Sequence, residues 1–214
     1  MNLRYILAAL AAGLSFAAAA PAANAAVIFT DNFDSYPYAD SNGYLDWVPP
    51  ANWTVSSGTV DLIGVGSNFD FFAGADGEYI DLNGSDDTFG TLTTLQTFAP
   101  GTYTLTFSLA GNQRGDVDKV TTVSLGDWSA SFDLPSSSPL IAYTYTFTTT
   151  VAGALSFADS AGRNGNGNLN IGNVLDSVSV ATAPEASTWT MLGLGFAGIG
   201  YAAFRRRKAP VSIA

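Results

Sequence analysis

The stretch that decides the fold reads Thr102-Tyr103-Thr104-Leu105-Thr106-Phe107-Ser108-Leu109-Ala110. Large apolar side chains alternate with threonine and serine, so an extended chain here has one apolar face and one face of hydroxyl groups. The preceding Ala99-Pro100-Gly101 is a turn signal. Residues 142–149 repeat the pattern, with aromatic side chains on one face and threonines on the other. Both stretches predict β-strands that bury one face in a core.

Shorter stretches of the same character continue along the middle of the chain, separated by turns rich in Gly, Asn and Asp. We expect further strands at 53–55, 60–63, 79–82, 92–98, 120–125, 128–132, 154–157 and 174–180. Residues 67–78 and 161–172 are expected to be loops, and no stretch of convincing length has a helical period. Many short strands of this kind predict an all-β domain with a jelly-roll or β-sandwich fold.

The N-terminus has the order of features that a signal peptidase recognises. Arg4 supplies positive charge, residues 5–20 are apolar, and Ala23-Asn24-Ala25 is a small-residue cleavage site. A buried N-terminal helix is the alternative, but the apolar stretch has no polar face. We therefore expect a signal peptide at 1–25, whose removal leaves an exported chain that starts near Ala26.

The composition excludes several classes of chemistry. The 214 residues include no cysteine and no histidine, which excludes disulfides, thiolate nucleophiles and a Ser-His-Asp triad. The net charge is −10, and between the two ends only Arg114, Lys119 and Arg163 are basic. A domain this acidic repels a phosphate backbone, so no nucleic-acid partner is expected.

The C-terminus consists of three parts in order. A motif formed by Pro184, Glu185, Ala186 and Trp189 comes first, residues 190–204 follow without a charge, and the basic residues Arg205, Arg206, Arg207 and Lys208 close the segment. A helix over 188–204 is about 25 Å long at the standard rise. This is shorter than the usual span of about 20 residues, but interfacial anchors make it workable, so we expect a short transmembrane helix whose basic end stays on the cytoplasmic side.

This order of motif, apolar helix and Arg-rich end closely resembles the PEP-CTERM sorting signal, also catalogued as the ice-binding protein C-terminal domain. The resemblance implies cleavage by an exosortase, transient anchoring in the inner membrane, and delivery to the cell surface or extracellular matrix. Ala186 departs from the family, which normally has proline there. An ordinary membrane anchor is the alternative. We assign 183–208 to the sorting signal and 209–214 to a tail.

Five phrases of the body fall in a recognisable order, at residues 52–64, 77–84, 95–98, 100–112 and 172–180. Together they resemble the choice-of-anchor extracellular domains, whose fold is a galactose-binding-like β-sandwich. Such domains are similar to carbohydrate-binding modules, so the resemblance implies a polysaccharide partner. It transfers no binding residues. Removal of both end signals leaves residues 26–182, which have the usual size of one domain, so we expect one extracellular domain there.

Exposed aromatic rings are the usual platforms for sugars, because a flat ring stacks on the apolar face of a pyranose. The candidates for glycan contact are Phe71 and Phe72, which lie in a predicted loop, and Trp47. Trp53 and Trp128 are expected to fill the core instead.

Calcium is the one cofactor that the sequence suggests. Hard cations bind several carboxylate and carbonyl oxygens, which acidic turns supply. No EF-hand spacing is present, and the candidate ligands are Asp31, Asn32, Asp34 and Asp176.

The leading hypothesis is an exported, non-enzymatic surface protein that binds glycan or exopolysaccharide. One alternative is a glycoside hydrolase, which needs two carboxylates held opposite each other. The acidic clusters that invite it are Asp76, Glu78 and Asp81, and Asp116 with Asp118. The other alternative is a purely structural matrix component. An ice-binding array of alternating threonines is not favoured, because no long regular repeat is present.

Overall fold

The computed structural model describes residues 25–37, 43–72, 77–183, 193–201 and 204. Residues 25–183 form one compact unit. Its described part contains eleven strands: β1 (Val27–Asp31), β2 (Trp53–Ser57), β3 (Asp61–Gly64), β4 (Glu78–Asp81), β5 (Thr91–Phe98), β6 (Gly101–Ala110), β7 (Lys119–Leu125), β8 (Trp128–Leu134), β9 (Ile141–Thr149), β10 (Gly153–Ala161) and β11 (Val174–Thr182).

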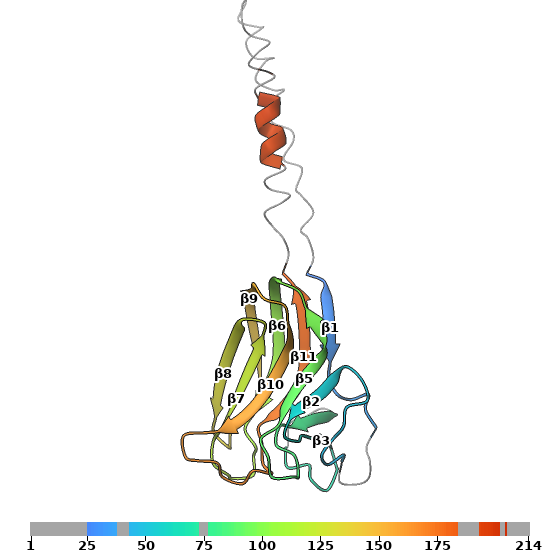
Figure 1. The fold of residues 1–214 in the computed structure, drawn as a ribbon, viewed down its shortest axis with the longest axis vertical. Helices are drawn as coiled ribbons and strands as arrows, with labels where there is room; N and C mark the ends of the chain where they lie inside the picture. Colours follow the sequence, from blue (N-terminus) through green and yellow to red (C-terminus); the bar gives the residue numbers. More distant parts are fainter. Residues whose placement is uncertain (1–24, 38–42, 73–76, 184–192, 202–203, 205–214) are drawn as a thin grey trace, which may run out of the picture. The chain divides into compact units, whose positions relative to one another are not determined.

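The strands form two antiparallel sheets, as Figure 1 shows. One sheet has the order β3-β4-β11-β6-β9 and includes β1, which also pairs with β11; the other has the order β2-β5-β10-β7-β8. Strands β4 and β1 share one side of β11, because β4 pairs with residues 174–175 and β1 with residues 178–181. The sheets pack face to face as a jelly-roll sandwich, so the predicted all-β fold is confirmed.

The core is filled by the apolar faces that the alternating pattern predicted. In β6 the inward side chains are Tyr103, Leu105, Phe107 and Leu109, all buried. Phe107 meets Phe132 and Phe157 of the opposite sheet edge-on, with ring centroids 5.5 and 5.4 Å apart. Trp53 is fully buried, and the partly buried Trp128 stacks on Phe147 at 4.1 Å. Both tryptophans pack in the core, as predicted.

Strand β1 is the strand that the sequence pattern did not predict. Val27, Ile28 and Phe29 form an apolar run without alternation, directly after the expected cleavage site. Pairing with the C-terminal half of β11 makes this run a strand. Within it only the side chains of Phe29 and Asp31 are buried.

The C-terminal segment is described in part. Residues 193–201 and 204 are helical. Among the described residues, no helix has both the length and the apolar character needed to span a membrane. The remaining residues of the predicted segment 188–204 lie outside the description, and so do the predicted signal peptide and the sequence-predicted residues Pro184, Glu185, Ala186, Trp189, Arg205, Arg206, Arg207 and Lys208.

Candidate functional site

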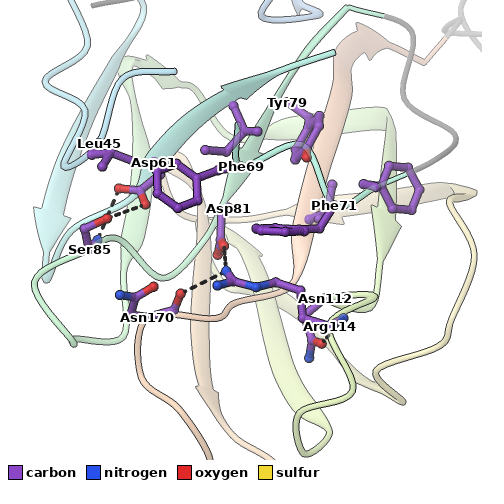
Figure 2. A pocket seen from close by; sticks show the side chains of 13 residues that line it. Leu45, Asp61, Phe69, Phe71, Tyr79, Asp81, Ser85, Asn112, Arg114 and Asn170 are labelled. Atoms are coloured by element: carbon purple, nitrogen blue, oxygen red, sulfur yellow. Dashed lines mark hydrogen bonds and ion pairs between the residues drawn. The ribbon is translucent and has the colours of Figure 1, made fainter. Parts of the chain in front are cut away.

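A cavity of about 120 Å³ lies beside β3 and β4, where they meet the loops that follow β3, β6 and β10. Figure 2 shows the side chains that line it. They combine apolar rings, two carboxyl groups, one guanidinium and several amide or hydroxyl groups: Leu45, Asp61, Ile63, Phe69, Phe71, Phe72, Tyr79, Asp81, Ser85, Asn112, Arg114, Asn170 and Val174.

The loop after β3 presents two aromatic rings to solvent. Phe69 is 38 % exposed and Phe71 is 48 % exposed, with ring centroids 6.3 Å apart. Phe72 turns inward and is 6 % exposed, because it packs edge-on against Tyr79 of β4 at 5.9 Å. Two neighbouring phenylalanines therefore have different roles: Phe71 faces the cavity from the surface, and Phe72 anchors its wall.

Asp70 fixes the conformation of this loop. Its carboxylate accepts hydrogen bonds from the backbone N–H groups of Gly66, at 2.9 Å, and Phe72, at 3.3 Å, and from the hydroxyl of Tyr79, at 3.2 Å. These bonds tie the loop to β4. The positions of the Phe69 and Phe71 rings are thus set by the fold.

Arg114 is the cation of the cavity. Its Cζ lies 4.7 Å from the centroid of the Phe71 ring, and its Nη1 donates to the carbonyl oxygen of Asn170 at 3.3 Å. The same Nη1 is 3.8 Å from Oδ2 of Asp81, and Figure 2 shows the guanidinium reaching toward both groups. The backbone N–H of Arg114 donates to Oδ1 of Asn112 at 2.9 Å, which fixes where the side chain starts.

Asp81 ends β4 at the wall of the cavity. Its Oδ1 accepts the backbone N–H groups of Asn83, at 3.0 Å, and Gly172, at 2.8 Å. A Cβ at Gly172 would lie 2.6 Å from this oxygen, so only glycine allows the approach. Burial raises the pKa of Asp81 to about 8, and the carboxyl group is therefore mainly protonated at neutral pH. Both of these donors reach Oδ1, and Oδ2 is the oxygen nearest to Arg114.

Asp61 stands opposite Asp81 in the β3–β4 pair. Its carboxylate accepts the backbone N–H of Asp46 at 2.6 Å and both the N–H and the hydroxyl of Ser85, at 3.2 and 2.9 Å. Burial raises the pKa of this group above its ordinary value, although these hydrogen bonds oppose the shift. Both carboxyl groups of the cavity are therefore easier to protonate than an exposed aspartate.

Lys119 holds the loop of residues 161–172 from its buried side. Its fully buried ammonium group donates to Asp116 at 2.9 Å, to the carbonyl of Asn168 at 3.0 Å and to the carbonyl of Asn166. The N–H of Asn168 also donates to Asp116, at 2.9 Å. Since Asn170 and Gly172 follow in the same loop, this buried ion pair determines where the loop meets Arg114 and Asp81.

A third buried carboxyl group continues the network into the core. Asp159 accepts the backbone N–H of Asn173 at 3.1 Å and the hydroxyl of Thr121 at 2.8 Å. Burial raises its pKa to about 7. Asp81 and Asp159 thus hold the successive N–H groups of Gly172 and Asn173.

The aromatic residues predicted to contact glycan divide into three cases. Phe71 lines the cavity with an exposed ring, and Phe72 lines it with a buried one. Trp47 is 2 % exposed and packs against Tyr36 in the core, with ring centroids 5.0 Å apart. The expectation of an accessible Trp47 is therefore corrected, because no face of its ring is open to a ligand.

Asp31, the first of the calcium candidates, is already satisfied by protein donors. It is buried, and its Oδ2 accepts the hydroxyl of Tyr36 at 2.5 Å and the indole N–H of Trp53 at 2.9 Å. Its Oδ1 accepts the backbone N–H of Phe33 at 2.9 Å. This carboxylate closes the N-terminal turn over the tryptophan, which is a structural role.

The other three calcium candidates also have protein partners. Asn32 donates to Asp34, which accepts the N–H of Glu78 at 2.9 Å, and Asp176 accepts the hydroxyl of Ser177 at 3.1 Å. In the part of the chain that the structure describes, no group of three or more acidic side chains is placed to hold a metal ion. Calcium binding at the four candidates stays a prediction.

Neither of the acidic clusters named for hydrolysis lies as a whole in the cavity. Asp81 lines the cavity but Glu78 does not, and Asp76 lies outside the described residues. Asp116 and Asp118 line a second, more open hollow between the loops after β6 and β8. The pair of carboxyl groups that does share the cavity is Asp61 and Asp81, which the sequence clusters did not combine.

Sequence reasoning also missed Arg114, Asn112 and Asn170. One signal was available for Arg114, because it is one of three basic residues between the two ends of an acidic chain. The amides carry no such signal, since residues 161–172 alone contain four asparagines.

The chain is similar to several solved carbohydrate-binding modules at low sequence identity. The CBM22-1 xylan-binding domain of Paenibacillus barcinonensis Xyn10C is 11 % identical, covers 78 % of this chain and 100 % of its own, and has a TM-score of 0.46. A family 35 module from Clostridium thermocellum is 15 % identical, with 65 % and 96 % coverage and a TM-score of 0.33. The C-terminal CBM6 of LamC, a marine laminarinase from Zobellia galactanivorans, is 10 % identical, with 50 % and 81 % coverage and a TM-score of 0.34.

A search of curated proteins finds no significant match. The family comparison does find one, at the C-terminus, where residues 182–208 match the PEP-CTERM protein-sorting motif. The match starts at the last residue of β11 and includes the Pro-Glu motif, the apolar segment and the Arg-rich end. The chain therefore carries a PEP-CTERM protein-sorting motif, as the order of these three parts predicted.

Proposed function

We propose that this chain is an exported, non-enzymatic surface protein whose β-sandwich binds glycan in the cavity beside Phe71. The observation that carries the proposal is the exposed pair of rings, Phe69 and Phe71, next to polar groups in one cavity. A flat ring stacks on the apolar face of a sugar, and amide and guanidinium groups hydrogen-bond to its hydroxyls. Phe71, Arg114 and Asn170 supply both kinds of contact within a few ångströms.

The binding test compares two truncations of exposed apolar side chains. Phe71→Ala removes the ring in the cavity, whereas Leu95→Ala removes a 63 % exposed side chain of β5 that does not line it. On a glycan array followed by titration calorimetry, Phe71→Ala should weaken binding by about tenfold, the value of one well-stacked ring. Leu95→Ala should bind like the wild type. Equal binding by all three proteins would contradict the site, and no binding to any glycan would contradict the function.

For delivery we propose export through the N-terminal signal, anchoring in the inner membrane and release to the envelope after exosortase cleavage near Pro184. The sorting motif supports this route. The last described backbone contact of the sandwich is the N–H of Ala183 donating to Thr102 at 2.9 Å. A cut just beyond it would leave every strand in place.

Mass spectrometry of the protein recovered from the cell surface tests this route. The expected mature chain starts near Ala26 and ends near Pro184. A matched Ala186→Pro variant, which restores the residue usual in the family, should be processed at least as completely. An intact Arg-rich tail in the membrane fraction would instead indicate an ordinary anchor.

One observation favours a second candidate, a glycoside hydrolase. Asp61 and Asp81 line the same cavity, and burial raises the pKa of both. A general acid must hold its proton at the working pH, as Asp81 does. Release of reducing sugar by the wild type and its loss in Asp81→Asn would establish hydrolysis. Binding without release supports the non-enzymatic function.

A further inference from the structure

We propose that the cavity selects acidic sugars, and that Arg114 binds the carboxylate of a uronic acid residue while the Phe71 ring stacks on its pyranose. This inference rests on the proposed glycan-binding function and names its substrate class. A guanidinium offers donors in a planar fork that matches a carboxylate. In this cavity the fork is already oriented by the Phe71 ring, 4.7 Å away, and by the carbonyl of Asn170.

The guanidinium keeps donors for a ligand. Of its five N–H groups, one donates to Asn170, and among the described residues this carbonyl is the acceptor within hydrogen-bond distance. Asp81 at 3.8 Å is too far for a hydrogen bond. The Arg114 side chain is 26 % exposed, so a ligand in the cavity can reach it. A carboxylate placed there would complete the bidentate contact that Asp81 does not make.

Protonation of Asp81 leaves the positive charge of Arg114 available to an anion. With a pKa of about 8, the carboxyl group is mainly uncharged at neutral pH and does not neutralise the guanidinium 3.8 Å away. The other acidic groups near the site are directed elsewhere. Asp61 accepts from Asp46 and Ser85, and the Tyr79 hydroxyl donates to Asp70.

Long-range charge acts against an acidic polymer, since the chain has a net charge of −10. At physiological ionic strength, however, exposed charges are screened beyond about 8 Å. Recognition therefore depends on contacts within the cavity. The single cation among the residues that line it is the group that can discriminate an acidic from a neutral sugar.

The test pairs each acidic glycan with its neutral counterpart. Galacturonan, mannuronan and glucuronan are titrated into the purified full chain, each alongside the same polymer after reduction of its carboxyl groups to alcohols. The wild type should bind at least one acidic polymer about tenfold more tightly than its reduced form, the effect of one charged hydrogen-bond pair. Arg114→Gln should lower binding to the level of the reduced polymer.

Arg163→Gln is the matched control, because it removes the same charge from an 84 % exposed side chain outside the cavity. It should leave the preference for acidic polymers intact.

Arg114→Lys keeps the charge and loses the planar fork of donors. Its affinity for acidic polymers should lie between those of the wild type and Arg114→Gln, and it tests the proposal if the glutamine variant does not fold. Above pH 8 the wild type should bind acidic polymers more weakly, because Asp81 is then ionised. The Asp81→Asn variant should keep its affinity for them at that pH.

The outcomes separate the two proposals. Equal binding of acidic and reduced polymers, with sensitivity to Phe71→Ala, would overturn the acidic-sugar inference and leave glycan binding in place. An acidic preference that Arg114→Gln does not change would overturn the role of this cavity in selecting the acid. Failure to bind any acidic, reduced or neutral glycan would overturn both.

Discussion

The outer face of β6 and β9 and the cavity beside β3 and β4 use polar side chains in opposite ways. On the outer face, threonines pair directly across the two strands: Thr102 with Thr148, Thr104 with Thr146, and Thr106 with Thr144, with hydroxyl oxygens 3.0 to 3.2 Å apart. Each hydroxyl also faces water. At the cavity, by contrast, buried carboxyl groups find their partners in loops far away in the sequence, as Asp81 does with Gly172.

The difference shows where specificity comes from in this fold. An exposed hydroxyl that loses its neighbour bonds to water instead, so the threonine pairs are interchangeable. A buried polar or charged group that loses its partner keeps the full cost of leaving water, so each partner at the cavity is required. The sandwich tolerates change on its faces, whereas the loops that bear the site depend on individual residues.

The largest effect is expected where a buried charge loses its partner. Lys119→Met removes the ammonium group that holds Asp116 and the carbonyls of Asn166 and Asn168. Breaking a buried ion pair in this way should lower the free energy of unfolding by about 3–5 kcal/mol, measured by urea denaturation.

The control for this prediction is another ion pair with a short N–O distance. Arg163 lies 2.6 Å from Asp133 but is 84 % exposed, so Arg163→Met should change stability by about 0–1 kcal/mol. Similar losses in both variants would mean that burial does not distinguish the two regions, and the comparison would fail.

The next effect is a pH dependence that comes from two buried carboxyl groups, one at the cavity and one in the core behind it. Asp81 and Asp159 have folded pKa values of about 8 and 7, against about 3.9 in an unfolded chain. Between about pH 4 and 8 the folded state therefore binds more protons than the unfolded state, and stability falls as pH rises. The free energy of unfolding should drop by an amount on the order of a few kcal/mol from pH 5 to 8.

Two comparisons locate this pH effect. Asp81→Asn should flatten the slope of stability against pH, whereas a threonine variant of the outer face should keep it. Stability that rises from pH 5 to 8 would contradict the assignment.

Asp127 has the opposite effect on stability at lower pH. Hydrogen bonds from Thr149 and Thr150 lower its pKa to about 2, so its contribution to stability is lost as pH falls below about 4.

The strands were predictable because their signal is local. In residues 102–110 the alternation of apolar and polar side chains alone predicts which face is buried, and the structure confirms it. Strand β1 was missed because its run of Val27, Ile28 and Phe29 lacks that period and becomes a strand only by pairing with β11. Pattern alone finds strands that alternate, and not those that tertiary pairing creates.

The site was predictable only to the level of one loop. An aromatic pair in a loop pointed to Phe71, but no period tells which of two adjacent loop residues faces inward, and Phe72 is the buried one. Trp47 was misjudged for the same reason. Arg114 meets Asp81 because β4 and β6 both pair with β11, a register that no local stretch of sequence records.

The smallest effect is expected on the outer face, and the same substitution can be made in the buried network behind the cavity. Thr104→Val keeps the branched side chain that suits a strand and removes one exposed hydroxyl. Its free energy of unfolding should stay within about 0.5 kcal/mol of the wild type, with glycan binding unchanged. Thr121→Val removes a buried hydroxyl that donates to Asp159 at 2.8 Å and should cost about 1–3 kcal/mol. If Thr104→Val costs as much as Thr121→Val, the threonine pairs form a cooperative network, and the outer face depends on individual residues as the cavity does.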